Sequence, residues 1–176
     1  MTDEWASRSL TPRDPRLDAW RAFLGAHARL FRRLDDELRS EHDLSLPEYD
    51  ALVHLAESPG RRLRMSRLAG LVLLSKSGVT RLIDRLEADG SVERLQCTHD
   101  ARGAEAVLTD EGLSRLRKAS STHLRGVERY FIGALDPSEL HTIERTMSSV
   151  SRLTGEMLEE SCEPMRATER SAARSG

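Results

Sequence analysis

The first regular feature of the chain is a long series of apolar residues with helical spacing. Its members recur at alternating steps of three and four: Leu17, Trp20, Leu24, His27, Phe31, Leu34 and Leu38, with Phe23 and Leu30 widening the series. That spacing places them on one side of an α-helix, and it predicts a helix of about 25 residues that ends near His42 and Asp43. The residues before it hold Pro12 and few apolar side chains, so we expect a flexible arm over residues 1–14.

Three shorter helices are predicted next. LSLPEYDALVHLAESPG has Pro47 in a plausible first turn, and MSRLAGLV has Ser66 near its start. In the following stretch Ser75 is a candidate N-cap, and Gly90 is placed to end the helix in a left-handed conformation. The apolar side of this last helix consists of Val79, Leu82, Ile83 and Leu86.

After Gly90 the apolar period falls to two. SVERLQC and AEAVLT are strand-like runs around THDARG, which predicts a β-hairpin. Thr109 can cap another helix that reaches about Phe131, and a break at Pro137 precedes a final apolar series that steps by three and four from Leu140 to Met157. We expect the remainder, residues 161–176, to be a flexible tail.

Charge is segregated along the chain despite a formal net charge of only -2. Between Gly60 and Leu86 the single acid is Asp84, whereas the basic residues are Arg61, Arg62, Arg64, Arg67, Lys76, Arg81 and Arg85. Because phosphates respond to local charge, this segment has the electrostatic character that nucleic-acid binding needs.

The order of these elements is that of a helix-turn-helix completed by a wing, so the helix after Ser75 is the predicted recognition helix. Ser77, Thr80 and Arg81 share its outer face with Asp84. Arg81 is the best candidate for a bidentate contact to guanine, and Ser75 and Lys76 at the helix start can hold phosphate oxygens.

The hairpin loop adds Arg102 at its tip, where it can enter a neighbouring minor groove. Asp100 is better suited to orient that arginine than to touch DNA, because a bare carboxylate is repelled by phosphate. The complete predicted DNA-binding set is Arg64, Ser66, Ser75, Lys76, Ser77, Thr80, Arg81, Arg85, Asp100 and Arg102.

Other classes of function receive less support. A helical dimer that binds another protein or RNA is the main alternative, and an enzyme is third. The sequence has no GxSxG, Walker A or GxGxxG motif, and its six histidines show no HExxH spacing. We therefore predict no catalytic residues, no metal and no cofactor. The two cysteines, Cys97 and Cys162, lie far apart and indicate neither a disulfide framework nor a zinc site.

Membrane insertion and export are not indicated either. No run approaches the roughly 18 to 20 apolar residues of a membrane span, and MTDEWASRSL lacks the basic and then apolar layout of a signal peptide. We expect the protein in the cytoplasm.

The chain resembles the MarR family of bacterial winged-helix regulators. The resemblance depends on SKSGVTRLIDRLEADGSVER as recognition helix and exit, on DARG followed by VLTDEG as the wing, and on LSLPEYDALVHLA upstream; it covers about residues 16 to 158. It implies a homodimer whose first and last two helices interleave with those of the partner. The terminal apolar series suit that role independently, because one thin monomer cannot cover them.

We thus predict a mainly α protein with a small β-hairpin wing. Residues 47–109 would form the winged helix-turn-helix DNA-binding domain, and residues 15–46 and 110–160 the dimerisation helices. Two recognition helices related by a two-fold axis would then read a pseudo-palindromic operator.

The resemblance also implies a crevice for a small aromatic or anionic ligand between the dimer helices and the DNA-binding lobe. Trp20, His27, Tyr49, Asp50 and Arg94 could border it. Each is equally plausible in the core or an interface, and neither the urate-responsive nor the peroxide-sensing subgroup pattern is matched clearly. The operator, the inducer and the sign of regulation stay open.

Overall fold

The computed structural model describes residues 9–72, 74–96 and 104–172, with residues 155–172 described as backbone only. The chain divides into two compact units, Met1–Tyr130 and Phe131–Gly176. We describe each unit by itself.

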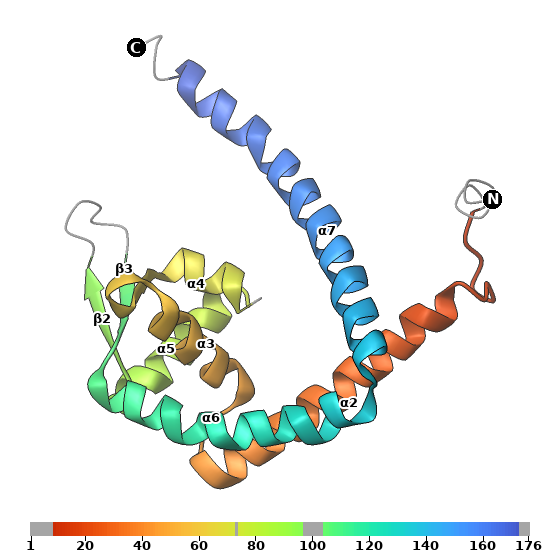
Figure 1. The fold of residues 1–176 in the computed structure, drawn as a ribbon. Helices are drawn as coiled ribbons and strands as arrows, with labels where there is room; N and C mark the ends of the chain where they lie inside the picture. Colours follow the sequence, from red (N-terminus) through yellow and green to blue (C-terminus); the bar gives the residue numbers. More distant parts are fainter. Residues whose placement is uncertain (1–8, 73, 97–103, 173–176) are drawn as a thin grey trace. The chain divides into compact units, whose positions relative to one another are not determined.

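The first unit contains five α-helices and a small sheet within its described residues (Figure 1). Its elements are α2 (Leu17–His42), α3 (Leu46–Glu57), the 3₁₀ turn η1 (Pro59–Arg61), β1 (Arg62–Arg64), α4 (Met65–Leu71), α5 (Lys76–Ala88), β2 (Val92–Gln96), β3 (Ala104–Leu108) and α6 (Asp110–Tyr130). The mainly helical fold with a winged helix-turn-helix is confirmed, and the long first helix ends where its apolar series predicts.

Side-chain caps set the starts of three helices. Ser45 caps α3 in a capping box with Glu48, and the Ser75 hydroxyl accepts the backbone N–H of Gly78 at the start of α5. The Thr109 hydroxyl accepts the N–H of Gly112 at 2.9 Å at the start of α6. Gly90, with φ of 75°, follows the end of α5 in the left-handed region. The predicted caps at Ser75 and Thr109 and the stop at Gly90 are confirmed.

The sheet has one strand more than predicted. Its order is β1-β3-β2 and both pairings are antiparallel, with Leu63 opposite Ala106 and Val92 opposite Leu108. The expected hairpin is present, but β1 adds a third strand along the other edge of β3. Sequence reading missed β1 because three residues are too few to show a period of two, although Leu63 is buried between exposed Arg62 and Arg64.

The core lies where the helix-turn-helix meets the sheet and the C-terminal end of α2. Its fully buried large side chains include Leu38, Leu44, Leu52, Leu55, Leu68, Leu82, Ile83 and Leu86, with Val92 from the sheet. At Leu34, Leu116 and Ala119 the core continues between α2 and α6, which pack against each other. The winged helix-turn-helix, α2 and α6 therefore share one hydrophobic core.

The second unit consists of the turn η2 (Ile132–Ala134) and the helix α7 (Pro137–Ala172). Asp136 begins α7: its Oδ1 accepts the N–H groups of Ser138 and Glu139, and these bonds hold the pKa of Asp136 below its ordinary value. The helix continues through Ala172 and so includes most of residues 161–176, the stretch for which a flexible tail is predicted. That stretch holds three Ala, three Arg, two Glu and one Met, residues that favour a helix, whereas Pro164 does not.

Candidate nucleic-acid interface

The helix α5 buries one side and exposes the other. Val79, Leu82, Ile83 and Leu86 are all buried, each at most 2% exposed. Since a helix repeats every 3.6 residues, this fixes which side chains point outward. From Lys76 to Arg85 the exposed ones are Lys76, Ser77, Thr80, Arg81, Asp84 and Arg85, as the sequence predicts.

Hydroxyl groups at the start of α5 are partly engaged by local hydrogen bonds. The Ser75 Oγ that caps the helix lies 3.1 Å from the Ser77 Oγ, and the Thr80 hydroxyl donates to the carbonyl of Lys76 at 2.9 Å. The hydroxyl proton of Thr80 is thereby used in this hydrogen bond, whereas the lone pairs of the hydroxyl oxygen still face solvent. Thr80 can accept a hydrogen bond from a base but cannot donate one in this rotamer.

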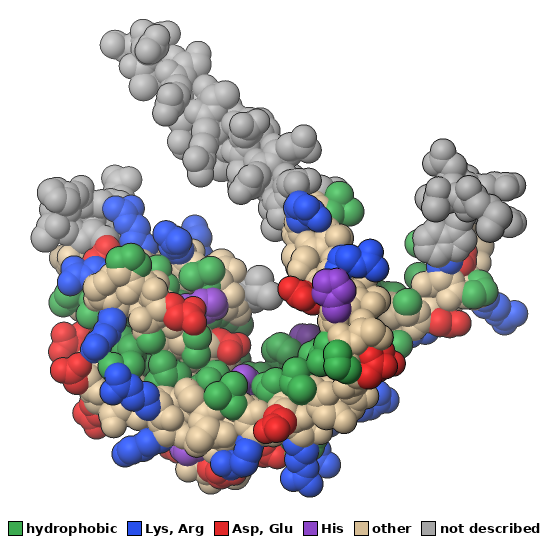
Figure 2. Space-filling view, in the orientation of Figure 1, with side chains coloured by type: hydrophobic (Ala, Val, Ile, Leu, Met, Phe, Trp, Pro, Cys, Tyr) green, Lys and Arg blue, Asp and Glu red, His purple; other side chains and the backbone are tan. Residues whose placement is uncertain are grey.

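Several of the basic residues predicted to contact DNA form no ion pair with an acidic residue in the described part of the chain. Within the described residues no ion pair engages Arg64, Lys76 or Arg81. Arg64 and Ser66 are exposed at the start of α4. Figure 2 shows Lys and Arg side chains gathered over the end of the lobe that carries α4 and the sheet. The cationic surface expected from the sequence is therefore present.

Arg85 differs from the other predicted contacts because a carboxylate of the protein holds it. Its Nε donates to Glu48 Oε1 at 2.6 Å, while 64% of the arginine side chain stays exposed. The other Glu48 oxygen accepts the backbone N–H and the hydroxyl of Ser45. Sequence reading missed Glu48, although its place three residues after Ser45 is the mark of a capping box.

The predicted wing contacts lie outside the described residues. β2 ends at Gln96 and β3 begins at Ala104, so Asp100 and Arg102 fall between them and are not placed. Cys97 is in the same stretch.

Comparison with known proteins identifies the family. A family model described as MarR family matches residues 42–103. The crystal structure of Sco3205, a MarR family transcriptional regulator from Streptomyces coelicolor in complex with DNA, matches with a TM-score of 0.75 and 35% identity over 82% of this chain and 89% of that one. AbsC, a MarR family transcriptional regulator from the same organism, matches with a TM-score of 0.75 and 37% identity over 85% and 99% of the two chains. The chain belongs to the MarR family.

A curated relative agrees with this assignment over part of its length. The HTH-type transcriptional regulator TtmR of Methylorubrum extorquens (strain PA1) is 35% identical over 90 residues, which are 51% of this chain and 44% of TtmR. The chain thus spans less than half of that relative. Proteins of this family are transcriptional regulators and not enzymes.

The MarR-family ligand candidates fall into separate groups. Trp20 and His27 lie exposed on α2 beside other aromatic rings, with the His27 ring centroid 4.1 Å from that of Phe31. Tyr49 and Asp50 lie on α3, where the Tyr49 ring is 4.5 Å from that of His123 on α6. Among the described residues, no ring contact or side-chain hydrogen bond joins the two groups.

His123 is the member of the second group that sequence reading missed. Burial lowers its pKa, which the Asp50 carboxylate partly offsets, and burial also raises the pKa of Asp50. The His123 Nδ1 is buried without a hydrogen-bond partner in the described structure. Its ring contact with Tyr49 depends on two helices far apart in sequence, so no local pattern could reveal it.

Arg94, the remaining ligand candidate, packs against the recognition helix. Its guanidinium donates to Asp84 Oδ1 at 2.5 Å and lies 3.7 Å from Glu87 Oε2. Asp84 and Glu87 both belong to α5, so Arg94 joins β2 to that helix. In this position it pairs with Asp84, the one acid among the exposed residues from Lys76 to Arg85.

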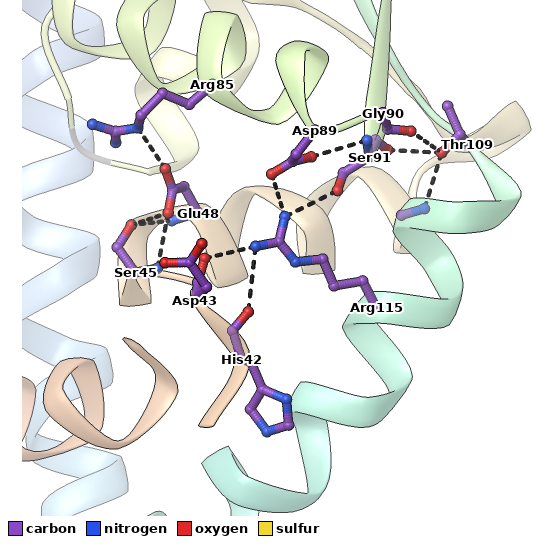
Figure 3. A network of polar contacts seen from close by, with 11 residues as sticks. His42, Asp43, Ser45, Glu48, Arg85, Asp89, Gly90, Ser91, Thr109 and Arg115 are labelled. Atoms are coloured by element: carbon purple, nitrogen blue, oxygen red, sulfur yellow. Dashed lines mark hydrogen bonds and ion pairs between the residues drawn. The ribbon is translucent and has the colours of Figure 1, made fainter. Parts of the chain in front are cut away.

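A polar network joins the recognition helix to the long helices of this MarR-family protein (Figure 3). Arg115 of α6 donates to Asp89 and Ser91 just after α5, and to the carbonyl oxygens of His42 and Asp43 at the end of α2. In this network Ser91 is buried and the Arg115 side chain is 23% exposed, whereas the Asp89 side chain is 38% exposed.

Neither a metal site nor a membrane span is found in the part of the chain that the structure describes. There, no group of three or more His, Cys, Asp or Glu side chains could hold a metal ion. The helices of that part also lack the length and apolar character that crossing a bilayer requires.

Proposed function

We propose that the protein represses transcription by binding a pseudo-palindromic operator in double-stranded DNA as a homodimer. The observation that carries the proposal is the outer face of α5, which presents Lys76, Ser77, Thr80 and Arg81 to solvent. A helix that buries its apolar side and exposes short polar groups and arginine is suited to the major groove.

The exposed residues would divide the work by chemistry. Arg81 would read guanine, and Lys76 with the free N–H groups at the start of α5 would hold phosphate. Arg64 and Ser66 would contact the backbone from α4, and Arg102, oriented by Asp100, would reach an adjacent minor groove. Arg85 would contribute charge at the edge of the interface while Glu48 holds it.

Dimerisation is supported by apolar side chains on α2 that the first unit leaves uncovered. Trp20, Phe23, Leu24 and Phe31 are 54%, 43%, 45% and 44% exposed on that helix. Large exposed apolar patches mark interaction sites, and a second copy of the chain would bury these rings. A two-fold dimer also matches the symmetry of a pseudo-palindrome.

Two further parts of the proposal concern regulation. A dimer bound to the operator would block RNA polymerase. Because bacterial DNA lies in the cytoplasm, the protein would act there. A small aromatic or anionic ligand would release the DNA, and the buried Tyr49 ring, with the His123 imidazole and the Asp50 carboxyl beside it, is the contact we propose for it. The DNA complex of Sco3205 supports the choice of DNA as partner.

The test is a selection of bound sequences from a random duplex library, followed by affinity measurements against salt. Contacts to several phosphates predict a log–log slope of roughly -0.9 per contact on duplex DNA. Single-stranded RNA of the selected sequence is the control, because the main alternative is an RNA- or protein-binding helical dimer. Failure to enrich any duplex, or a flat salt response, would refute the proposal.

A further inference from the structure

Arg115 occupies the point where three helices meet. It lies in the second turn of α6, and its side chain is 23% exposed. One terminal nitrogen, Nη1, pairs with Asp89 and lies 3.3 Å from the Ser91 Oγ. The other, Nη2, donates to the Asp43 carbonyl at 2.6 Å and to the His42 carbonyl at 3.3 Å (Figure 3). One guanidinium thus bonds both to the end of α5 and to the end of α2.

The α5 side of this contact is itself held firmly. Asp89 is the C-cap residue of α5, and its Oδ1 accepts the backbone N–H of Ser91 at 3.0 Å. The Ser91 carbonyl in turn accepts the N–H and the hydroxyl of Thr109. A displacement of Asp89 therefore also moves the last turn of the recognition helix.

The α2 side offers acceptors that a cation stabilises well. His42 is the last residue of α2 and Asp43 is its C-cap in the left-handed region, with φ of 50°. Carbonyl oxygens at a helix C-terminus lack partners within the helix and carry partial negative charge. Arg115 donates hydrogen bonds to two of these carbonyl oxygens, and its positive charge pairs with the negative charge of Asp89.

We propose that Arg115 is a positioning residue that fixes the angle of the recognition helix relative to α2 and α6, and so sets the half-site spacing that the dimer accepts. This inference rests on the proposed function. An α-helix of 13 residues is roughly 20 Å long, so a tilt of about 10° about its C-terminal end moves its N-terminal end by about 3.4 Å. That displacement equals the rise of one base pair, about 3.4 Å. Control of a few degrees at Asp89 is enough to decide the register in the groove.

The experiment measures binding of the full chain to the selected operator and to duplexes whose half-sites are one or two base pairs closer or farther apart. Arg115→Met removes the charge at similar length, and Asp89→Asn removes the charge at the other end but keeps the oxygen that Ser91 uses. Arg117→Met is the matched control, since Arg117 is an exposed arginine on the same helix. Circular dichroism and sedimentation report folding and dimerisation.

Wild type and Arg117→Met should prefer the native spacing by about tenfold or more, the usual scale of one mismatched site position. Arg115→Met and Asp89→Asn should lower this preference to about twofold, with affinity for non-specific duplex unchanged, because no phosphate contact is lost. Arg115→Lys retains the charge but offers one compact donor group instead of a fork, so it should restore the preference only in part.

Full spacing preference in a folded Asp89→Asn protein would overturn the proposal, even if Arg115→Met failed to fold. An equal loss in Arg117→Met would overturn it too, since overall charge would then explain the effect. If the wild-type protein bound no duplex, the proposed function itself would be refuted. If the wild-type protein preferred the native half-site spacing and the Arg115 and Asp89 variants showed the same preference, only the positioning role of Arg115 would be refuted.

Discussion

Replacing Gly112 by alanine should destabilise the protein, although alanine is the better helix former. Gly112 is the glycine of VLTDEG, the run that follows the wing loop, and it lies buried in the first turn of α6. A Cβ there would lie 2.0 Å from the carbonyl oxygen of Ser91 and 2.8 Å from the Leu108 Cδ1. Real Cβ contacts essentially never fall below 3.0 Å, so α6 and the start of β2 would have to separate by about 1 Å.

The size of the effect follows from what this separation breaks. The Ser91 carbonyl accepts the Thr109 N–H at 3.2 Å and the Thr109 hydroxyl at 3.1 Å. Two hydrogen bonds contribute about 1 kcal/mol each, and forcing atoms into a packed core costs about 1–3 kcal/mol. The gain in helix propensity offsets about 1 kcal/mol. We expect Gly112→Ala to lower the free energy of unfolding by about 2–4 kcal/mol.

Urea unfolding followed by circular dichroism, at one fixed protein concentration because a dimer's stability depends on it, measures this change. Gly70→Ala is the matched control: Gly70 is also helical, and a Cβ there meets nothing within 4 Å. It should be neutral or stabilise by up to about 1 kcal/mol. A Gly112→Ala protein as stable as wild type would refute the steric account of this glycine.

Three other outcomes are expected. Arg81→Ala should reduce the preference for selected over scrambled duplex by roughly 1–3 kcal/mol in a gel shift, whereas Lys76→Ala should weaken both alike; retained preference would remove the base-reading role of Arg81. Phe31→Ala should raise the dimer dissociation constant by about tenfold in sedimentation, and an unchanged constant would place the interface elsewhere. Burial lowers the pKa of His123 in the folded state, so the unfolded chain takes up a proton first as pH falls below about 6.5, and stability declines there. His123→Gln should lessen that decline between pH 7.5 and 5.5 in urea unfolding, and an equal decline would assign it to other groups.

Local signals explain why the helices and caps could be predicted. The apolar series on α2, the caps at Ser75 and Thr109 and the stop at Gly90 each depend on side chains within a few residues, and each is confirmed. The outer face of α5 follows from the same periodicity, because burying Val79 and Leu82 leaves Arg81 outside.

Features that depend on distant segments could not be predicted in this way. Arg85 and Arg94 are cations in the sequence, yet one is held by Glu48 of α3 and the other by Asp84 of α5. Strand β1 exists only because β3 pairs with it. Arg115 has no feature in the sequence that sets it apart from the other arginines of α6, and its role arises from the meeting of three helix ends.

Glu48 has a consequence for how the protein can evolve. The same carboxylate completes the capping box of α3 with Ser45 and holds Arg85 of α5. Ser45→Asp, ordinarily a tolerated exchange of one cap for another, would here set two carboxylates against each other. Drift at any one of these three positions should therefore depend on the other two, and natural variants that lose Glu48 should have changed Ser45 and Arg85 together with it.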